Sequence, residues 1–295
     1  MNFRTDLALE KKEFLKETSA EGITSEEKEE EGIKISTIEI LNEKGEKLLE
    51  KKKGKYITID AGSLLSYPEN AEKIISVLSK EISKLLPKEG SVLVVGLGNE
   101  SITPDALGPE CVSLVLATRH IKGELAEKTG LSSLRSVGAI APGVLGKTGI
   151  ETVEIISALS KELRPAAIIT VDALASRRLS RLGTTVQLTD SGISPGSGVG
   201  NSRPAIDRDT LGVPVIAIGI PTVVDAGTMA FDIAEKYLGE AALKPEDFQN
   251  GENLMMVTPK EIDLVIERAA MIVAMSINCC LQPTLTLEEI LKIVC

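Results

Sequence analysis

Residues 91–109 read Ser91-Val-Leu-Val-Val-Gly-Leu-Gly-Asn-Glu-Ser-Ile-Thr-Pro-Asp-Ala-Leu-Gly-Pro109, an apolar strand that leads through a glycine-rich turn toward a helix. A second stretch of this kind follows, Ala166-Ala-Ile-Ile-Thr-Val-Asp-Ala-Leu-Ala-Ser-Arg177. Each carries one aspartate, Asp105 or Asp172, after its apolar run. The carboxyl ends of strands in an open parallel sheet meet at one crevice, so we expect the two aspartates to face each other.

The alternation of strand, turn and helix continues along the chain and predicts a doubly wound α/β fold, a mostly parallel sheet flanked by helices. Apolar runs typical of strands buried on both faces occur at 92–95, 137–141, 166–171 and 213–220. Residues 184–188 alternate more and are predicted to form an edge strand. Helices are predicted near 106–122, 149–163, 174–182, 222–238 and 258–281, and the capping-box pattern at 286–289 predicts a last short helix.

The N-terminal part has a different character. Residues 7–33 are crowded with Glu and Lys, and we expect a charged, mobile arm or an exposed helix. After it, residues 33–41 alternate like a half-buried strand, a turn is predicted at 42–45, and residues 56–60 form a second strand. The prediction is a small β-hairpin attached to a single α/β domain over residues 7–295.

The composition narrows the function. The net charge of −10 argues against a surface that binds nucleic acid, because that affinity depends on Lys and Arg near phosphates. The apolar run 269–281 is too short to span a bilayer, and the N-terminus lacks the apolar core of a signal peptide. The four cysteines, Cys111, Cys279, Cys280 and Cys295, form no C-x-x-C pair. We therefore expect a soluble, cytoplasmic protein with inert thiols.

Two glycine-containing turns resemble nucleotide-binding motifs. Gly96-Leu-Gly98 follows a strand, but Ser101 stands where a dinucleotide fingerprint has its third glycine, so a tight turn is the simpler interpretation. Residues 141–148, Ala-Pro-Gly-Val-Leu-Gly-Lys-Thr, form a phosphate-loop pattern with Ala for the first Gly. Lys147 and Thr148 would then hold phosphates and magnesium. Pro142 removes one N–H from the backbone cradle on which such loops depend.

A long irregular loop spans residues 190–201, and five of its twelve residues are Gly or Pro. Such loops often bind substrate, which makes Asp190, Ser191 and Gly192 candidates for substrate contact. His120 is the only histidine, and a lone histidine is more often structural than catalytic.

The two aspartates admit a structural interpretation as well as a chemical one. Either Asp105 or Asp172 could cap the helix that follows it. Two carboxylates at the same sheet edge are unfavourable unless they share a proton or a metal, and this favours chemistry over capping.

Several further stretches resemble the germination protease family of spore-forming bacteria. They are Arg4-Thr-Asp-Leu-Ala8, 94–99, 103–109, Pro142-Gly-Val, 148–151, Asp172-Ala-Leu-Ala175, 190–193, 195–201, 211–226 and Val257-Thr-Pro-Lys260. The resemblance implies an atypical aspartic endopeptidase that is made as a zymogen, forms a homotetramer, uses no cofactor and degrades small acid-soluble spore proteins in the spore core during germination. It also implies a fold like that of hydrogenase-maturation proteases.

The resemblance places the family's two essential aspartates on Asp105 and Asp172 and its self-processing bond between Asp6 and Leu7. Residues 1–6 would then be a propeptide. The chain departs from longer members of the family, which carry an extra segment where it has only residues 239–253.

The mechanistic hypothesis has one aspartate activating a water and the other acting as an acid, with the roles unassigned. Gly98, Asn99 and the 190–201 loop would donate N–H groups to the developing oxyanion. Two alternatives remain open: a metal-dependent hydrolase that uses the same carboxylates, and a phosphate-loop nucleotide-binding module at 141–148.

Overall fold

The structure is a computed structural model of the chain, and it describes residues 5–13, 15, 21–64, 70–121, 127, 131, 133–200, 203–238 and 255–294. The shortened region at 239–253 and Cys295 therefore lie outside the described residues. The strands are β1 Ile23–Glu30, β2 Ile33–Ile40, β3 Gly54–Asp60, β4 Val92–Gly96, β5 Val137–Ile140, β6 Ala167–Ser176, β7 Thr185–Thr189, β8 Val215–Asp225 and β9 Met256–Val257. The α-helices are α1 Ala8–Glu13, α2 Glu43–Leu49, α3 Ala71–Leu85, α4 Leu107–Ser113, α6 Leu145–Thr148, α7 Thr152–Leu163, α8 Arg208–Leu211, α9 Ala226–Leu238, α11 Ile262–Leu281 and α12 Leu287–Val294. Three 3₁₀ turns are η1 Thr103–Asp105, η2 Leu179–Arg181 and η3 Ser197–Val199.

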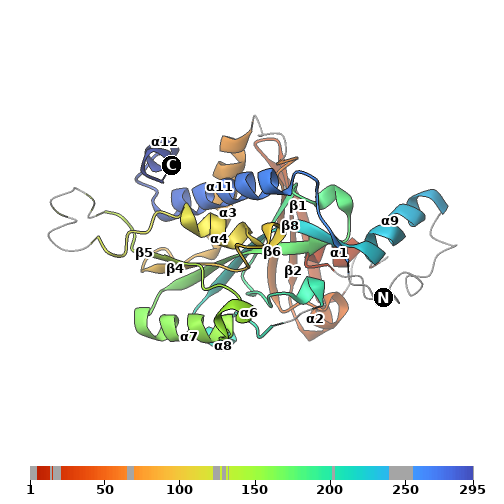
Figure 1. Ribbon diagram of the computed structural model, residues 1–295, viewed down its shortest axis with the longest axis horizontal. Helices are drawn as coiled ribbons and strands as arrows, with labels where there is room; N and C mark the ends of the chain where they lie inside the picture. Colours follow the sequence, from red (N-terminus) through yellow and green to blue (C-terminus); the bar gives the residue numbers. More distant parts are fainter. Residues whose placement is uncertain are drawn as a thin grey trace.

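One mixed sheet organises the molecule, with the strand order β1-β2-β3-β7-β8-β6-β4-β5 and β9 paired to β8 (Figure 1). Strands β8, β6, β4 and β5 are parallel to one another, whereas β1, β2, β3 and β7 extend the sheet through antiparallel pairs. The α/β fold class is confirmed; Asp172 lies in the parallel part of the sheet, and Asp105 lies in the η1 turn that follows β4.

Helices cover both faces of the parallel strands, with α3, α4 and α11 on one side and α6, α7 and α8 on the other (Figure 1). Successive side chains of a strand point to opposite faces. In β4, Val92 and Val94 therefore pack in the larger core beneath α11, and Leu93 and Val95 pack in the smaller core with α7. This alternation explains why β4 reads as one continuous apolar run.

Strand β6 outruns its neighbour β4, and this difference shapes the site. The pairing between them ends at Gly96 and Val171, but β6 continues to Ser176 because β8 pairs with it along that length. The expected helix at 174–182 is therefore wrong, and strand and the η2 turn occupy the region instead. Asp172 consequently lies within a strand and does not cap a helix.

The N-terminal region is more ordered than the sequence indicates. Where a charged, mobile arm or an exposed helix was expected over residues 7–33, the structure has the short helix α1, preceded by the fully buried Leu7 and beginning at the fully buried Ala8, and β1 paired with β2. β1 lies at the sheet edge with its charged side chains mostly exposed, a common way to protect an edge from further pairing. The hairpin is thus β1-β2, and the turn expected at 42–45 begins helix α2, capped by Asn42.

Three other expectations are corrected or refined. β7 is an interior strand between β3 and β8, with every residue buried, and is not an edge strand. The helix expected at 106–122 ends at Ser113. α11 has 20 residues, long and apolar enough by length and composition to cross a membrane, but 67% of its most apolar window is buried inside the protein. The predicted capping box is present: the Thr286 and Glu289 side chains bond to each other's backbone N–H groups.

Candidate active site

Asp172 is held by the middle of the sheet. It pairs with Gly219 of β8, and only 6% of its surface is exposed. It shares a face of β6 with Ile168, which packs in the smaller core, so its side chain lies on the same side as α6 and α7. The N–H of Ala173 donates to Oδ1 of Asp172 at 3.0 Å.

Asp105 is brought back to the same edge by the turn after β4. The N–H of Asn99 donates to Oδ2 of Asp105 at 2.9 Å and to its carbonyl oxygen at 3.0 Å. Gly98 has φ +111, and a Cβ there would lie 2.1 Å from the carbonyl oxygen of Asp105, so the turn requires glycine. The Asn99 N–H, which we expected to contact a substrate, therefore orients Asp105.

The two aspartates line one cleft of about 510 Å³. Its wall includes the α6 segment, the turn after β4 and the loop after β7, together with Asp6. Burial raises the pKa of Asp105 to about 6, although the Asn99 N–H opposes the shift. Burial, together with the charges of Asp105 and Asp6, raises the pKa of Asp172 well above its ordinary value. The pKa shift is the larger one for the more deeply buried Asp172, so Asp105 is the more readily ionised member of the pair.

Asp6 occupies the overhanging edge of β6. Its N–H donates to the carbonyl oxygen of Ala175, and the N–H of Ala175 donates to Oδ2 of Asp6, both at 2.9 Å. Ser197 Oγ donates to Oδ1 at 2.9 Å. Gly198 makes room for this carboxylate, because a Cβ there would lie 2.1 Å from Oδ2 of Asp6. Ala175, Ser197 and Gly198 thus form a binding site for the carboxylate of Asp6.

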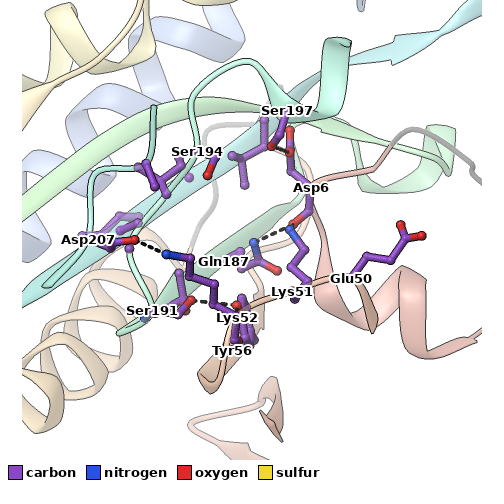
Figure 2. A pocket seen from close by; sticks show the side chains of 18 residues that line it. Asp6, Glu50, Lys51, Lys52, Tyr56, Gln187, Ser191, Ser194, Ser197 and Asp207 are labelled. Atoms are coloured by element: carbon purple, nitrogen blue, oxygen red, sulfur yellow. Dashed lines mark hydrogen bonds and ion pairs between the residues drawn. The ribbon is translucent and has the colours of Figure 1, made fainter. Parts of the chain in front are cut away.

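A second, smaller pocket of about 230 Å³ also includes Asp6 and is lined by residues 50–52 after α2, by β3, β7 and β8, and by the loop after β7 (Figure 2). Two side chains from this pocket reach the carbonyl oxygen of Asp6: Lys51 Nζ at 2.7 Å and Gln187 Nε2 at 3.0 Å. Burial lowers the pKa of Lys51, and the nearby Asp6 opposes the shift. Asp6 thus lines both cavities; the aspartate pair lines the larger one, and Lys51 and Gln187 line the smaller one.

The helix that follows Asp6 is fixed by a buried carboxylate. Glu10 is fully buried and accepts from the N–H groups of Arg177 at 2.7 Å and Arg178 at 2.9 Å, and from the hydroxyl of Thr5. Arg181 lies 3.4 Å away. These contacts attach α1 to the end of β6 and hold the Asp6–Leu7 peptide in place.

The loop residues chosen from the sequence lie to one side of this cleft. Asp190 accepts from the N–H of Lys55, and Ser191 bonds to Tyr56 Oη at 2.7 Å. Ser191 and Gly192 line the smaller pocket, whereas the aspartate cleft takes the later part of the same loop, residues 193–196. Contact of Asp190, Ser191 and Gly192 with a substrate stays a prediction.

Other candidate groups are engaged elsewhere. Lys147 donates to Ser101 Oγ at 2.6 Å, and Thr148 Oγ1 donates to backbone carbonyls, so the phosphate-loop pattern forms a short helix that lines the aspartate cleft. His120 is exposed and lies outside the cleft. Within the part of the chain that the structure describes, no group of three or more His, Cys, Asp or Glu side chains is placed to hold a metal ion.

Comparison with known proteins identifies the family. The model of the germination protease family matches residues 4–242, most of the chain and the whole of the site described above. The chain belongs to the germination protease family. Germination proteases of Caldanaerobacter subterraneus subsp. tengcongensis and Clostridium acetobutylicum are 48% and 43% identical to it. The alignments cover 98% of this chain and 97% of the first relative, and 99% and 98% for the second.

A more distant germination protease, from Priestia megaterium, is 40% identical over 94% of this chain and 93% of its own length. Among solved structures, a [NiFe] hydrogenase maturation protease, HycI of Thermococcus kodakarensis KOD1, is similar with a TM-score of 0.37 and 14% identity. That match covers 66% of this chain and 97% of the other. Because the chain belongs to a protease family, peptide hydrolysis is the reaction to assign to the cleft.

Proposed function

We propose that this chain is an aspartic endopeptidase zymogen that cuts its own Asp6–Leu7 bond and afterwards degrades small acid-soluble spore proteins. One observation carries the proposal: Asp6 lies in the cleft that also contains Asp105 and Asp172. The bond that follows Asp6 is the one that the family resemblance selects. Leu7, on the far side of that bond, is fully buried, as an apolar residue in a fitted pocket would be.

The pKa shifts suggest how the two aspartates divide the work. Asp105 is ionised near neutral pH and takes a proton from a water, whose oxygen then attacks the carbonyl carbon of Asp6. Asp172, whose pKa burial raises well above its ordinary value, acts as the acid and delivers its proton to the nitrogen of Leu7 as the carbon–nitrogen bond breaks. The products are a carboxyl group on Asp6 and a free amine on Leu7. Transfer of the water-derived proton from Asp105 to Asp172 restores the pair.

The same cleft would serve protein substrates once residues 1–6 have left. An extended substrate can pair with the free edge of β6 as Asp6 does, and the Ala175 N–H and Ser197 Oγ would then bind an acidic side chain before the cut bond. We also propose a homotetramer in the spore core, which light scattering on the purified protein would test.

Incubation of the full chain and measurement of its intact mass test the proposal. The expected product begins at Leu7, and the Asp105→Asn and Asp172→Asn chains remain uncut and leave a purified small acid-soluble spore protein intact. A different new N-terminus, or cleavage by either variant at the wild-type rate, would overturn the proposal. Loss of activity in the presence of a chelator would point instead to a metal-dependent hydrolase.

A further inference from the structure

The carbonyl oxygen of Asp6 accepts hydrogen bonds from two side-chain donors. Lys51 Nζ and Gln187 Nε2 both reach it, at 2.7 and 3.0 Å, and Figure 2 shows them approaching from the smaller pocket. Lys51 is partly buried beside the ring of Tyr56, and Gln187 is 5% exposed. A partly buried ammonium and a buried amide that donate to one oxygen point to a chemical role.

The orientation of Gln187 follows from its partners. Its Oε1 accepts from the N–H of Ala8 at 2.9 Å, so its Nε2 must be the atom that faces the carbonyl oxygen of Asp6. A single amide therefore binds the chain on both sides of the Asp6–Leu7 bond. It comes from β7, an interior strand, which gives it a rigid base.

Lys51 and Gln187 are also placed to stabilise the negative charge that develops on the carbonyl oxygen of Asp6 during hydrolysis. When water adds to a peptide carbonyl, negative charge develops on the oxygen, and preorganised donors 2.7–3.1 Å away stabilise it. An ammonium donor forms stronger hydrogen bonds than a neutral one. We propose that Lys51 and Gln187 form the oxyanion-binding pair of this protease. The inference rests on the proposed self-cleavage, because it gives these residues a role in breaking that bond.

The pair completes the reaction without an additional group. As the water oxygen bonds to the carbon of Asp6, the electrons of the carbonyl double bond move to the oxygen held by Lys51 and Gln187. They return when the bond to the Leu7 nitrogen breaks, and Asp172 supplies the proton for the leaving amine. Asp105 and Asp172 then transfer protons only, whereas Lys51 and Gln187, which line the smaller pocket, stabilise the oxyanion.

The test measures the first-order rate of self-cleavage of the full chain by mass spectrometry. Lys51→Met and Gln187→Leu are each expected to slow cleavage about 100-fold or more, the usual effect of removing one oxyanion donor. Lys51→Arg, which keeps the charge, should recover most of the rate. Lys53→Met is the matched control, because Lys53 belongs to the same lysine run but is exposed, and a surface change should leave the rate within about twofold.

A second measurement separates an oxyanion role from simple docking of the segment. Hydrogen exchange of the Ala175 amide, which Asp6 protects, reports whether residues 5–7 remain in place. Slow cleavage with protection retained supports the inference. Slow cleavage with protection lost in both variants means that the pair only docks the segment, and overturns it.

The other outcomes are equally decisive. Should the wild-type chain cut at Asp6–Leu7 while Lys51→Met and Gln187→Leu match its rate, the oxyanion inference fails and the proposed function stands. Should the wild-type chain fail to cut there, both fail. If Lys51→Met does not fold, Gln187→Leu carries the same test.

Discussion

Asp6 and Ala175 exchange two hydrogen bonds, from the N–H of Asp6 to the carbonyl of Ala175 and from the N–H of Ala175 to the carboxylate of Asp6. Ala175 lies three residues beyond Asp172 on the same strand, so the pairing fixes Asp6 at a set distance along β6 from the buried aspartate. The backbone of Ala175 thus binds both the backbone and the side chain of Asp6. This explains how a short segment can be held in register without forming a strand.

The rate of self-cleavage should depend on pH in a bell-shaped manner. Below about pH 6 Asp105 gains a proton and can no longer accept one from water, so the rate falls. At high pH Asp172 loses the proton that it must donate, and the rate falls again, at a pH well above the ordinary value for Asp. Single-turnover rates between pH 4 and 9 would show this profile, with circular dichroism confirming folding at each pH. A rate that falls steadily from pH 5 to 7 would contradict the assignment of Asp105 as the base.

Asp105 should lower the stability of the folded chain at neutral pH. Its folded-state pKa of about 6 lies above the ordinary 3.8, so folding disfavours the ionised form. The contribution of Asp105 to the free energy of unfolding is therefore greatest below about pH 4 and declines as the pH rises to about 6. We expect Asp105→Asn to be more stable than the wild type at pH 7.5 by at most about 3 kcal/mol, reduced because solvent screens this partly exposed carboxylate.

Urea unfolding at pH 4 and 7.5 checks this expectation. Asp60→Asn is the control, because Asp60 is exposed and accepts only a local bond from Gly62, and it should change stability little at either pH. An Asp105→Asn chain that is less stable than the wild type at pH 7.5 would show that the raised pKa is misassigned.

Gly198→Ala should slow self-cleavage while leaving the fold intact. The added Cβ would lie 2.1 Å from Oδ2 of Asp6, so the carboxylate must leave its site beside Ala175 and Ser197. Each of these bonds to a charged group contributes about 1.5–3 kcal/mol, so loss of both should weaken docking of the segment by about 100-fold or more. Gly146→Ala is a matched control, because Gly146 lines the same cleft and a Cβ there meets no atom within 4 Å. Equal rates for the two variants would remove Gly198 from the site.

Glu10→Gln should loosen the segment that carries the cleaved bond. Glu10 accepts from two backbone N–H groups and the Thr5 hydroxyl, and an amide would turn a donor toward at least one of them. A lost buried bond to a charged group costs about 1.5–3 kcal/mol, so trypsin should cut at Lys11 and Lys12 at least about 10-fold faster. Glu13→Gln removes exposed ion pairs only and should have little effect. Unchanged trypsin sensitivity would mean that α1 is held by other contacts.

The sequence predicted the parts of the site that rest on local patterns. β4 and the first half of β6 are apolar runs, and each is followed by its aspartate, so Asp105 and Asp172 were both found. The overhang of β6 was not, because its length depends on pairing with β8, some 45 residues further on. A helix was predicted in its place, since Ala and Leu favour helices in isolation.

Lys51 and Gln187, which bind the carbonyl oxygen of Asp6, were not predicted from the sequence for a similar reason. Lys51 belongs to a run of three lysines that reads as a solvated surface, and Gln187 lies in an otherwise ordinary strand. The role of these two side chains is indicated by their contact with Asp6, which lies 45 positions from Lys51 and 181 positions from Gln187. Ser197 was within a loop that was identified, but nothing in the sequence showed which end of that loop faces the aspartates.

The unequal lengths of β4 and β6 have a consequence for the product of cleavage. Strand edges with unpaired N–H and C=O groups are templates on which other chains can add. While Asp6 is in place it shields the overhang of β6 at Ala175. If the proposed cleavage releases Asp6, the edge of β6 beside the aspartates becomes unpaired, and extended polypeptides, including other copies of this chain, can then pair with it. The proposed cleavage would therefore lower the solubility of the protein, which favours storing it with residues 1–6 attached.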